Sequence, residues 1–156
     1  MNFEEIIHTI QSNMTSENPS RDIPVVIVSP ELILRVCTEI HQHSSLYFDM
    51  LSCITGLDNG PDAGTMEVIY QVYSIPFNKS LMLKVIMPRE GAQLESVCSV
   101  WKGANWLERE VYDMFGIRFI NHPDMRRILM PADLEGYPLR KDYQQQELYR
   151  DIQVKY

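Results

Sequence analysis

Apolar and polar residues alternate most regularly between residues 65 and 75. A period of two predicts a strand that buries one of its faces. The side chains expected on that face are Met66, Val68, Tyr70, Val72 and Ser74. Residues 24–28, 46–57 and 81–87 also predict strands, and Pro88 ends the last of them. Turn-forming residues at 56–64 and 76–79 separate the last three strands, which therefore predict an antiparallel meander.

Apolar residues at helical spacing predict four helices, over residues 3–11, from Pro30 to about His43, 93–101 and 104–115. Ser29 is expected to cap the second helix, with Pro30 in its first turn. A polar loop is expected from Met14 to Asp22.

These elements predict an α/β protein of the α+β type. We expect a two-layer sandwich with a mixed, mainly antiparallel sheet, helices on one face and an extended C-terminal tail. Residues 1–120 would form the domain, including the helix at 104–115. Residues 121–156 would form an ordered loop and a partner-binding tail, because the tail holds too few apolar residues to build a core of its own.

Composition narrows the classes of function. The 156 residues carry a formal net charge of −7, which argues against nucleic acid as the main partner. No apolar run approaches the roughly 20 residues that span a bilayer. The acidic first residues do not resemble a signal peptide. We therefore expect a cytosolic chain that meets a membrane only through partners.

The three cysteines do not predict a metal site. Cys37, Cys53 and Cys98 are far apart, and no C-x-x-C pair occurs. An iron–sulfur cluster or structural zinc held by this chain alone is therefore not favoured. We interpret the cysteines as small buried thiols in a reducing compartment.

The helix at 104–115 has two different sides. A helical wheel puts Trp106 on the polar side, together with Arg109, Glu110 and Asp113. A tryptophan there is either an interface anchor or is covered by later chain. Gly116 is well placed as the C-terminal cap of this helix.

Glu108 falls on the apolar side of the same helix, where a carboxylate needs a partner. Two interpretations stay open. Glu108 could complete a capping box with Asn105. Alternatively, it could form an ion pair with Arg118, Arg126 or Arg127 and so fix the following loop.

The segment after this helix is rich in charge. His122 precedes a proline, and a structural hydrogen bond is the expected role of a single histidine. Asp124 is expected to cap the turn that follows it. The basic pairs Arg126–Arg127 and Arg140–Lys141 lack the glycine-rich loop of a nucleotide site. We expect them to pair with acids, either those of a partner or Asp133, Glu135 and Asp142.

Three stretches together resemble a known signature. They are Glu108–Phe119, His122–Leu129 and Pro138–Tyr143. This pattern closely resembles the 30-kilodalton subunit family of respiratory complex I, which is the C-type subunit of bacterial NADH–quinone oxidoreductase. One departure is Asn121, where the family usually has glycine. Asparagine tolerates a left-handed backbone, so the turn is expected to survive.

The resemblance implies a subunit of the peripheral arm, on the cytoplasmic side of the membrane. It implies that the chain holds no catalytic residue, flavin, cluster or quinone site, and that FMN, iron–sulfur clusters and quinone belong to partner subunits. The signature segment and tail would pack on the 49-kilodalton subunit. The residues expected at this interface are Trp106, Glu108, Arg109, Glu110, Asp113, His122, Asp124, Arg126, Arg127, Arg140, Lys141 and Asp142.

Two other functions compete with this one. The chain could be the equivalent subunit of a membrane-bound hydrogenase or ferredoxin-linked complex. It could also be a stand-alone enzyme that uses His122, Glu108 and the arginine cluster. The second alternative requires these groups to converge on one pocket.

Overall fold

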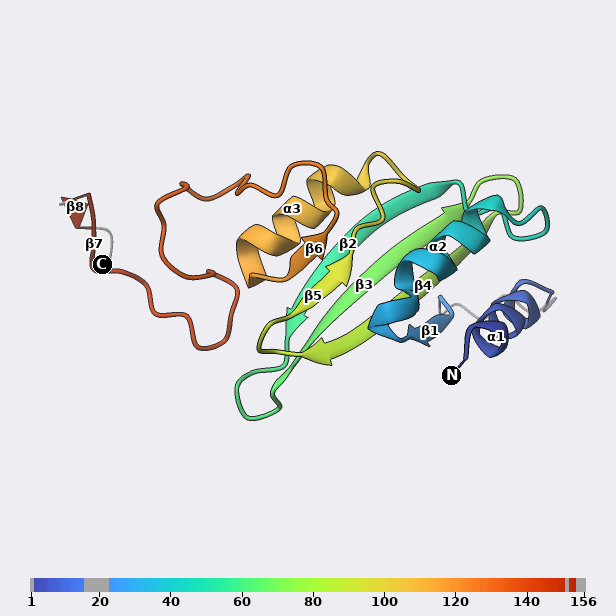
Figure 1. Cartoon of the computed structure of the whole chain (residues 1–156), viewed down its shortest axis with the longest axis horizontal. Coiled ribbons are helices and arrows are strands. Elements are labelled where there is room, and N and C mark those ends of the chain that lie inside the picture. Colours follow the sequence, from blue (N-terminus) through green and yellow to red (C-terminus); the bar gives the residue numbers. More distant parts are fainter. Residues whose placement is uncertain (1, 16–22, 151, 154–156) are drawn as a thin grey trace.

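The computed structural model describes residues 2–15, 23–150 and 152–153 (Figure 1). A central sheet has the strand order β1-β4-β3-β2. Its strands are β1 (Val25–Val28), β2 (Met50–Asp58), β3 (Thr65–Ser74) and β4 (Lys79–Pro88). The last three form an antiparallel meander, and β1 runs parallel to β4. The predicted mixed, mainly antiparallel sheet is therefore confirmed.

Strand β3 lies in the middle of the sheet and shows most directly why this chain forms one. The five alternating residues of β3 predicted to be buried are all fully buried. On β4, the same face of the sheet buries Leu81, Leu83, Val85 and Met87. The other face carries an ion pair between Lys84 and Glu67, with 2.6 Å between Nζ and Oε2. The core therefore lies on one side of the sheet.

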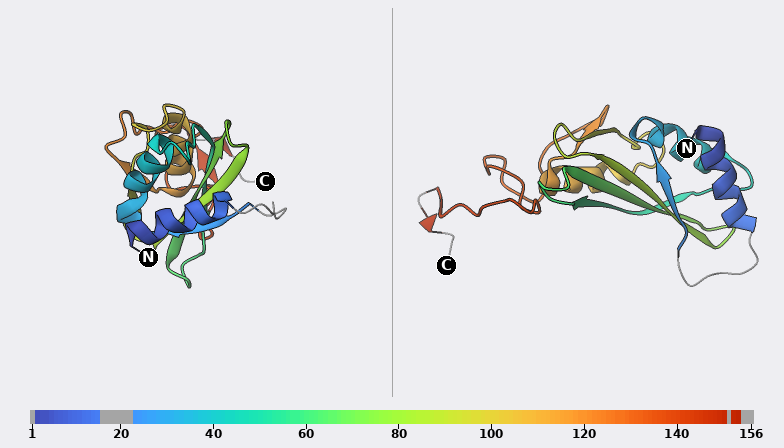
Figure 2. Two further views of the ribbon diagram at one scale, coloured as in Figure 1. Left: turned by 90° about the vertical axis from the view of Figure 1, so that its right-hand side faces the viewer. Right: turned by 90° about the horizontal axis from the view of Figure 1, so that it is seen from below.

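The helices cover that buried side (Figure 2). They are α1 (Phe3–Thr15), α2 (Ile33–Gln42) and α3 (Ala104–Phe115). The predicted two-layer arrangement is confirmed. Helix α1 continues beyond the predicted end at residue 11. The rest of the predicted loop, residues 16–22, lies outside the described residues.

The start of α2 differs from the prediction. A 3₁₀ turn, η1 (Pro30–Leu32), precedes the helix, and the Ser29 side chain makes no capping hydrogen bond. The buried side of α2 consists of Ile33, Val36, Cys37 and Ile40. The turn begins at Pro30, and α2 begins at Ile33, which is fully buried.

The predicted helix at 93–101 is wrong. Strand β5 (Gln93–Glu95) pairs in parallel with β6 (Arg118–Ile120). Leu94, Val97 and Trp101 are buried, as their spacing suggested, but in a strand and turns. The indole of Trp101 donates to Phe48 O at 3.2 Å. Burial of these three residues produced the apparent helical period, while pairing with β6 satisfies the backbone groups along one edge of β5.

Helix α3 packs very closely on β2, and Gly56 makes this possible. A Cβ atom at Gly56 would lie 2.6 Å from the Phe115 ring and 3.1 Å from Val111.

After β6 the chain continues beyond the body of the molecule to a small hairpin of β7 (Leu148–Tyr149) and β8 (Ile152–Gln153) (Figure 1). Among the described residues, none of the helices combines the length and the hydropathy that a membrane-spanning helix requires.

Candidate functional site

Asp113 is the centre of the contacts between α3 and the segment that follows it. Its side chain is fully buried, contrary to the wheel, which put Asp113 on the polar side with Trp106. Oδ2 accepts hydrogen bonds from the backbone N–H groups of Ile128, Leu129 and Met130 at 3.0, 2.7 and 2.8 Å. The segment at 128–130 therefore covers a side of α3 that was expected to face outward.

Arg127 supplies the countercharge for Asp113. Its Nη1 lies 2.7 Å from Asp113 Oδ1, and its Nη2 donates to the carbonyls of Leu134 and Gly136 at 3.0 and 2.7 Å. Burial alone would raise the pKa of Asp113, but these N–H groups and the guanidinium outweigh burial and lower it. Arg127 thus connects α3 to the loop at 134–136.

The other predicted acid–base pairs also differ in the structure. Arg126 pairs with Asp124 at 2.6 Å, so Asp124 binds a side chain rather than capping the turn. Asp133 pairs with Arg150 at 2.8 Å. The pattern of charges indicated pairing with acids of this chain or of a partner, but sequence alone did not identify which residues pair.

The C-terminal end of α3 is capped by the later segment. Gly116 has a φ of +76°, and its N–H donates to Tyr112 O at 2.8 Å, which confirms the predicted glycine cap. The Leu139 N–H donates to Met114 O at 3.1 Å, and Arg140 Nε donates to Phe115 O at 2.7 Å. These bonds satisfy carbonyls that a helix end leaves free. Residues 139–140 are therefore bound to the end of α3.

A third anchor fixes residues 141–142 at the end of β2. Asp58 is 4% exposed and accepts hydrogen bonds from Arg89 Nε at 2.9 Å and from the Lys141 N–H at 2.9 Å. Arg89 also forms an ion pair with Asp142. Asp58 and Arg89 were not predicted, because the only local signal was the turn that follows β2.

The Asp58 anchor should make the fold sensitive to acid. Burial alone would raise the pKa of Asp58, but Arg89 and the N–H groups of Lys141 and Gly60 lower it from 3.8 to about 2. The depressed pKa contributes stability above pH 3.8 that is lost as the pH falls toward 2, about 2 kcal/mol in all. We expect Asp58→Asn to be less stable than the wild type at pH 6, with the difference shrinking below pH 4. Urea unfolding at several pH values would measure it, and a difference independent of pH would contradict the role of the ionised carboxylate.

Glu108 lies inside the domain and is fully buried. Its Oε1 accepts from the Val97 N–H at 2.7 Å, and its Oε2 accepts from Ser96 Oγ at 2.7 Å and from Cys98 Sγ at 3.4 Å. Both predicted interpretations are wrong, since neither Asn105 nor an arginine is its partner. Gly103 occupies the N-cap of α3 and Glu108 instead binds the turn after β5. Burial raises the pKa of Glu108.

Cys98, Glu108 and His122 place three potential metal-binding atoms within 4.8 Å of one another. The hydrogen bonds of His122 bear on this possibility. Its Nδ1 accepts from the Asp124 N–H at 2.9 Å, which leaves the ring proton on Nε2, facing Asn105 O at 3.1 Å. A neutral imidazole binds a metal through its unprotonated nitrogen, and here the Asp124 N–H occupies that nitrogen. The predicted structural hydrogen bond of His122 is confirmed.

The requirement of a stand-alone enzyme is met only in part. Glu108 and His122 do converge, with 3.8 Å between Oε2 and Nε2, and both side chains are enclosed. Arg127 and Arg140, however, are bound at Asp113 and Phe115. The arginine cluster therefore does not join the other two groups at one pocket.

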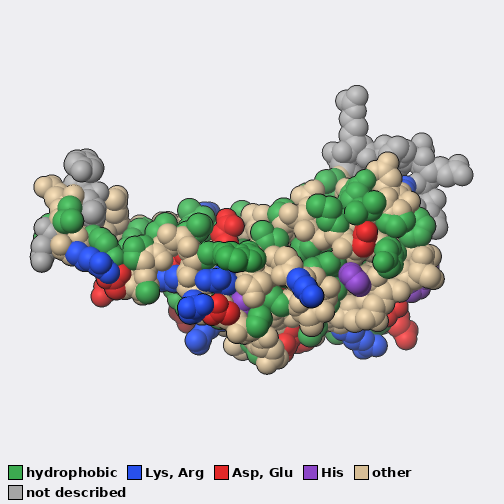
Figure 3. Space-filling model, turned by 90° about the horizontal axis from the view of Figure 1, so that it is seen from above, with side chains coloured by type: hydrophobic (Ala, Val, Ile, Leu, Met, Phe, Trp, Pro, Cys, Tyr) green, Lys and Arg blue, Asp and Glu red, His purple; other side chains and the backbone are tan. Residues whose placement is uncertain are grey.

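Other predicted interface residues lie at the surface. Trp106 is 63% exposed, and the Arg109 guanidinium lies 5.3 Å from the centre of its ring. The exposed members of the predicted set are Trp106, Glu110, Arg126, Lys141 and Asp142. Arg109, Asp124, Arg127 and Arg140 are half-buried, and the side chain of His122 is enclosed. Acidic and basic side chains lie next to one another along the C-terminal part of the molecule (Figure 3). Binding of a partner by these residues stays a prediction.

Comparisons with a family model and with individual proteins point to the same protein family. The family model for "Respiratory-chain NADH dehydrogenase, 30 Kd subunit" matches residues 26–149. A C-type subunit of the NADH-quinone oxidoreductase of Rhizobium etli is 36% identical over 143 residues, which cover 92% of this chain and 76% of that protein. The C-type subunit of the same enzyme in Chloroherpeton thalassium is 45% identical over 118 residues. That match covers 75% of this chain but only 48% of the relative, so the chain spans about half the length of that protein.

Two solved structures share the fold. A trypsin-resistant fragment (1–134) of Nqo5 is 29% identical with a TM-score of 0.59, and the match covers 80% of this chain and 99% of the fragment. A chain of the membrane-bound sulfane sulfur reductase, an archaeal respiratory membrane complex, is 25% identical with a TM-score of 0.70. That match covers 90% of this chain and 85% of the other.

Proposed function

Because the chain belongs to the family of the 30-kilodalton subunit of the respiratory-chain NADH dehydrogenase, we propose that it is a scaffold subunit of a proton-translocating NADH–quinone oxidoreductase. In this proposal it sits in the peripheral arm, on the cytoplasmic side of the membrane, and docks on the 49-kilodalton subunit. FMN, iron–sulfur clusters and quinone would be held by partner subunits. The family match carries the proposal, and the geometry around α3 supports the docking role.

The geometry supports docking because the signature segment is held in one position. The contacts at Asp113, at the end of α3 and at Asp58 fix residues 127–142 against the domain. Exposed side chains on such a segment lose little conformational freedom when a partner binds, which favours affinity. Leu129 and Leu139 are exposed apolar residues of this segment, and Trp106 is exposed on α3. We propose that these side chains contact the 49-kilodalton subunit.

The tail after Tyr143 would extend the contact. Its described contacts include hydrogen bonds from Tyr149 and Arg150 to Asp133, which lies in the same C-terminal part of the chain. Leu148 and Ile152 are 60% and 67% exposed. We propose that residues 121–143 fold as part of the domain and that residues 144–156 form the partner-binding tail. Val154 and Tyr156, which the tail also offers, lie outside the described residues.

A second candidate rests on the archaeal structure. The match to the chain of the sulfane sulfur reductase covers 90% of this protein's length, whereas the match to the Nqo5 fragment covers 80%. The equivalent subunit of another membrane-bound respiratory complex, such as a hydrogenase or a ferredoxin-linked complex, is therefore an alternative. Affinity purification of the tagged chain from solubilised membranes, followed by mass spectrometry, distinguishes the two. Co-purified flavin-binding and NADH-binding subunits support the proposal, and hydrogenase or sulfur-reductase subunits in their place would replace it.

Trp106→Ala should weaken assembly without weakening the fold. A central tryptophan at an interface typically accounts for about 2–4 kcal/mol, or roughly 30-fold to 1,000-fold in affinity. Loss of an exposed side chain should change the free energy of unfolding by only about 0.5 kcal/mol. The measurements are recovery of partner subunits with the tagged chain and urea unfolding of the isolated chain. Lys102→Ala, an exposed change in the turn before α3, is the control and should leave both unchanged. Normal recovery of partners by Trp106→Ala would contradict the interface role.

Truncation after Tyr143 should separate folding from assembly. The three anchors lie before this point, so we expect a melting temperature within about 2 °C of the full chain and loss of partner recovery. Truncation after Ile120 is the matched control. It removes Arg127 and the N–H groups that bind Asp113, and it should lower the melting temperature strongly. A large drop for the shorter deletion would show that the tail belongs to the domain.

A further inference from the structure

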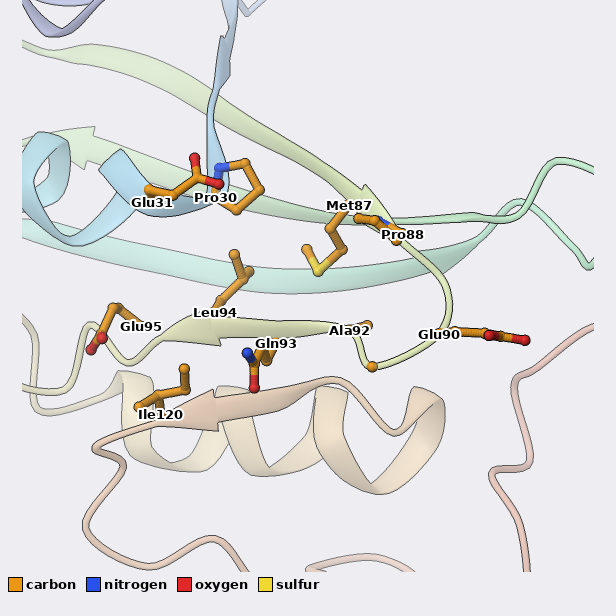
Figure 4. Close-up of a pocket in the computed structure, with 11 residues that line it drawn as sticks. Pro30, Glu31, Met87, Pro88, Glu90, Ala92, Gln93, Leu94, Glu95 and Ile120 are labelled. Atoms are coloured by element: carbon orange, nitrogen blue, oxygen red, sulfur yellow. The ribbon is translucent and has the colours of Figure 1, made fainter.

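A groove lies on the helix-bearing side of the molecule, and none of the side chains proposed above for docking lines it. It has a volume of about 440 Å³ and runs between η1, the end of β4 and β5 (Figure 4). Its floor is formed by the apolar side chains of Met87 and Leu94, which are 3% and 2% exposed. Pro30, Pro88 and Ile120 complete the apolar lining. The floor can therefore accept an aliphatic side chain.

The walls of this groove carry charge of one sign. Glu31, Glu90 and Glu95 line it, and neither lysine nor arginine does. Arg89, which is next to Glu90 in the chain, is turned instead toward Asp58 and Asp142. Within the described residues, none of the three glutamates forms an ion pair. Glu95 accepts a hydrogen bond from Asn121 Nδ2 at 3.0 Å, which leaves its charge uncompensated. The groove therefore favours a cationic occupant.

Strand β5 contributes a free backbone edge. The carbonyl of Ala92 accepts from the Arg118 N–H, and the Ser96 N–H donates to Ile120 O, so the even-numbered residues pair with β6. The backbone groups of Gln93 and Glu95 then point away from β6. In the described part of the chain, these outward groups have no backbone partner. Pro30, Met87 and Pro88 lie on that side of β5, opposite β6 (Figure 4). An unpaired edge beside an apolar floor is a typical site for an added extended segment.

We propose that this groove binds an extended segment of a partner protein in which aliphatic residues alternate with lysine or arginine. The aliphatic side chains lie on Met87 and Leu94, and the basic side chains reach Glu31 and Glu90. The backbone of the segment bonds to the free edge at Gln93. Side chains of an extended segment point alternately to opposite sides, which matches an apolar floor with an acidic rim. No residue that lines the groove belongs to the proposed contact with the 49-kilodalton subunit, so the inference does not depend on that docking.

The test uses the full chain and a fluorescein-labelled octapeptide of alternating valine and lysine. Fluorescence anisotropy measures its affinity at low salt. An octapeptide of alternating valine and glutamate controls for charge, and one of alternating glycine and lysine controls for the apolar contact. Both control peptides are expected to bind at least about tenfold more weakly, since each lacks one of the two contacts.

Two variants test the site itself. The double change Glu31→Gln and Glu90→Gln should weaken the valine–lysine peptide about threefold to tenfold, as expected for two exposed ion pairs. Gln93→Pro should abolish binding, because proline removes the outward N–H without breaking the pairing with β6, and Gln93→Ala should not. Circular dichroism confirms that the variants are folded. Equal binding of the three peptides, or unchanged binding by the double glutamine variant, would overturn the proposal even if Gln93→Pro failed to fold.

Discussion

Asp113→Ala is expected to destabilise the domain by about 3–5 kcal/mol, which is comparable to much of the stability of a chain of this size. The change leaves the Arg127 guanidinium without a countercharge in a mostly enclosed position. It also leaves the N–H groups of Ile128, Leu129 and Met130 without their common acceptor. A buried charge or donor that loses its partner costs far more than the bond contributed. Urea unfolding of the isolated chain would measure the loss.

The neighbouring helix position provides a control for Asp113→Ala. Glu110→Ala removes an equally charged but exposed side chain from α3, and it should change the free energy of unfolding by about 0.5 kcal/mol or less. Asp113→Asn keeps one acceptor for the backbone N–H groups and should fall between the two. Similar losses for Asp113→Ala and Glu110→Ala would mean that the contact with residues 127–130 contributes little.

The elements that sequence predicted well are those in which local pattern and burial agree. The alternation in β3 was reliable because that strand lies in the middle of the sheet with one face on the core. The prediction of Gly116 as the C-terminal cap was reliable because the left-handed backbone at the end of a helix favours glycine, whatever the rest of the fold. In both cases no distant partner had to be known.

The predictions that failed concern residues whose environment is set by segments far away in the sequence. The wheel put Asp113 on the outer side of α3, and only the return of residues 128–130 made that side an interior one. Residues 93–95 became a strand because β6, more than twenty residues later, offers a partner. Asp58 gained its role from Lys141, and no pattern near Asp58 announces it. Sequence thus indicated that this region is densely charged, whereas the identity of each pair required the fold.

Glu108 is the second position where a large effect is expected, and its pH dependence should be opposite to that of Asp58. Glu108→Ala leaves the Val97 N–H and Ser96 Oγ without an acceptor and opens a cavity. We expect a loss of about 3 kcal/mol. Glu108→Gln keeps an acceptor and the shape of the side chain, and it should cost clearly less.

The direction in which the stability contribution of Glu108 changes with pH follows from burial, which raises the pKa of Glu108 above the ordinary 4.5. A carboxyl group whose pKa is higher in the folded state binds more protons there than in the unfolded chain. Its contribution is therefore fully present at pH values below 4.5 and declines as the pH rises through the folded pKa. In Glu108→Gln this decline should disappear, so the stability difference between the wild type and this variant should shift in favour of the variant as the pH rises. Unfolding in urea from pH 4 to pH 8 measures that difference. A difference that moves in favour of the wild type instead would show that the donors around Glu108 stabilise its ionised form more than burial opposes it.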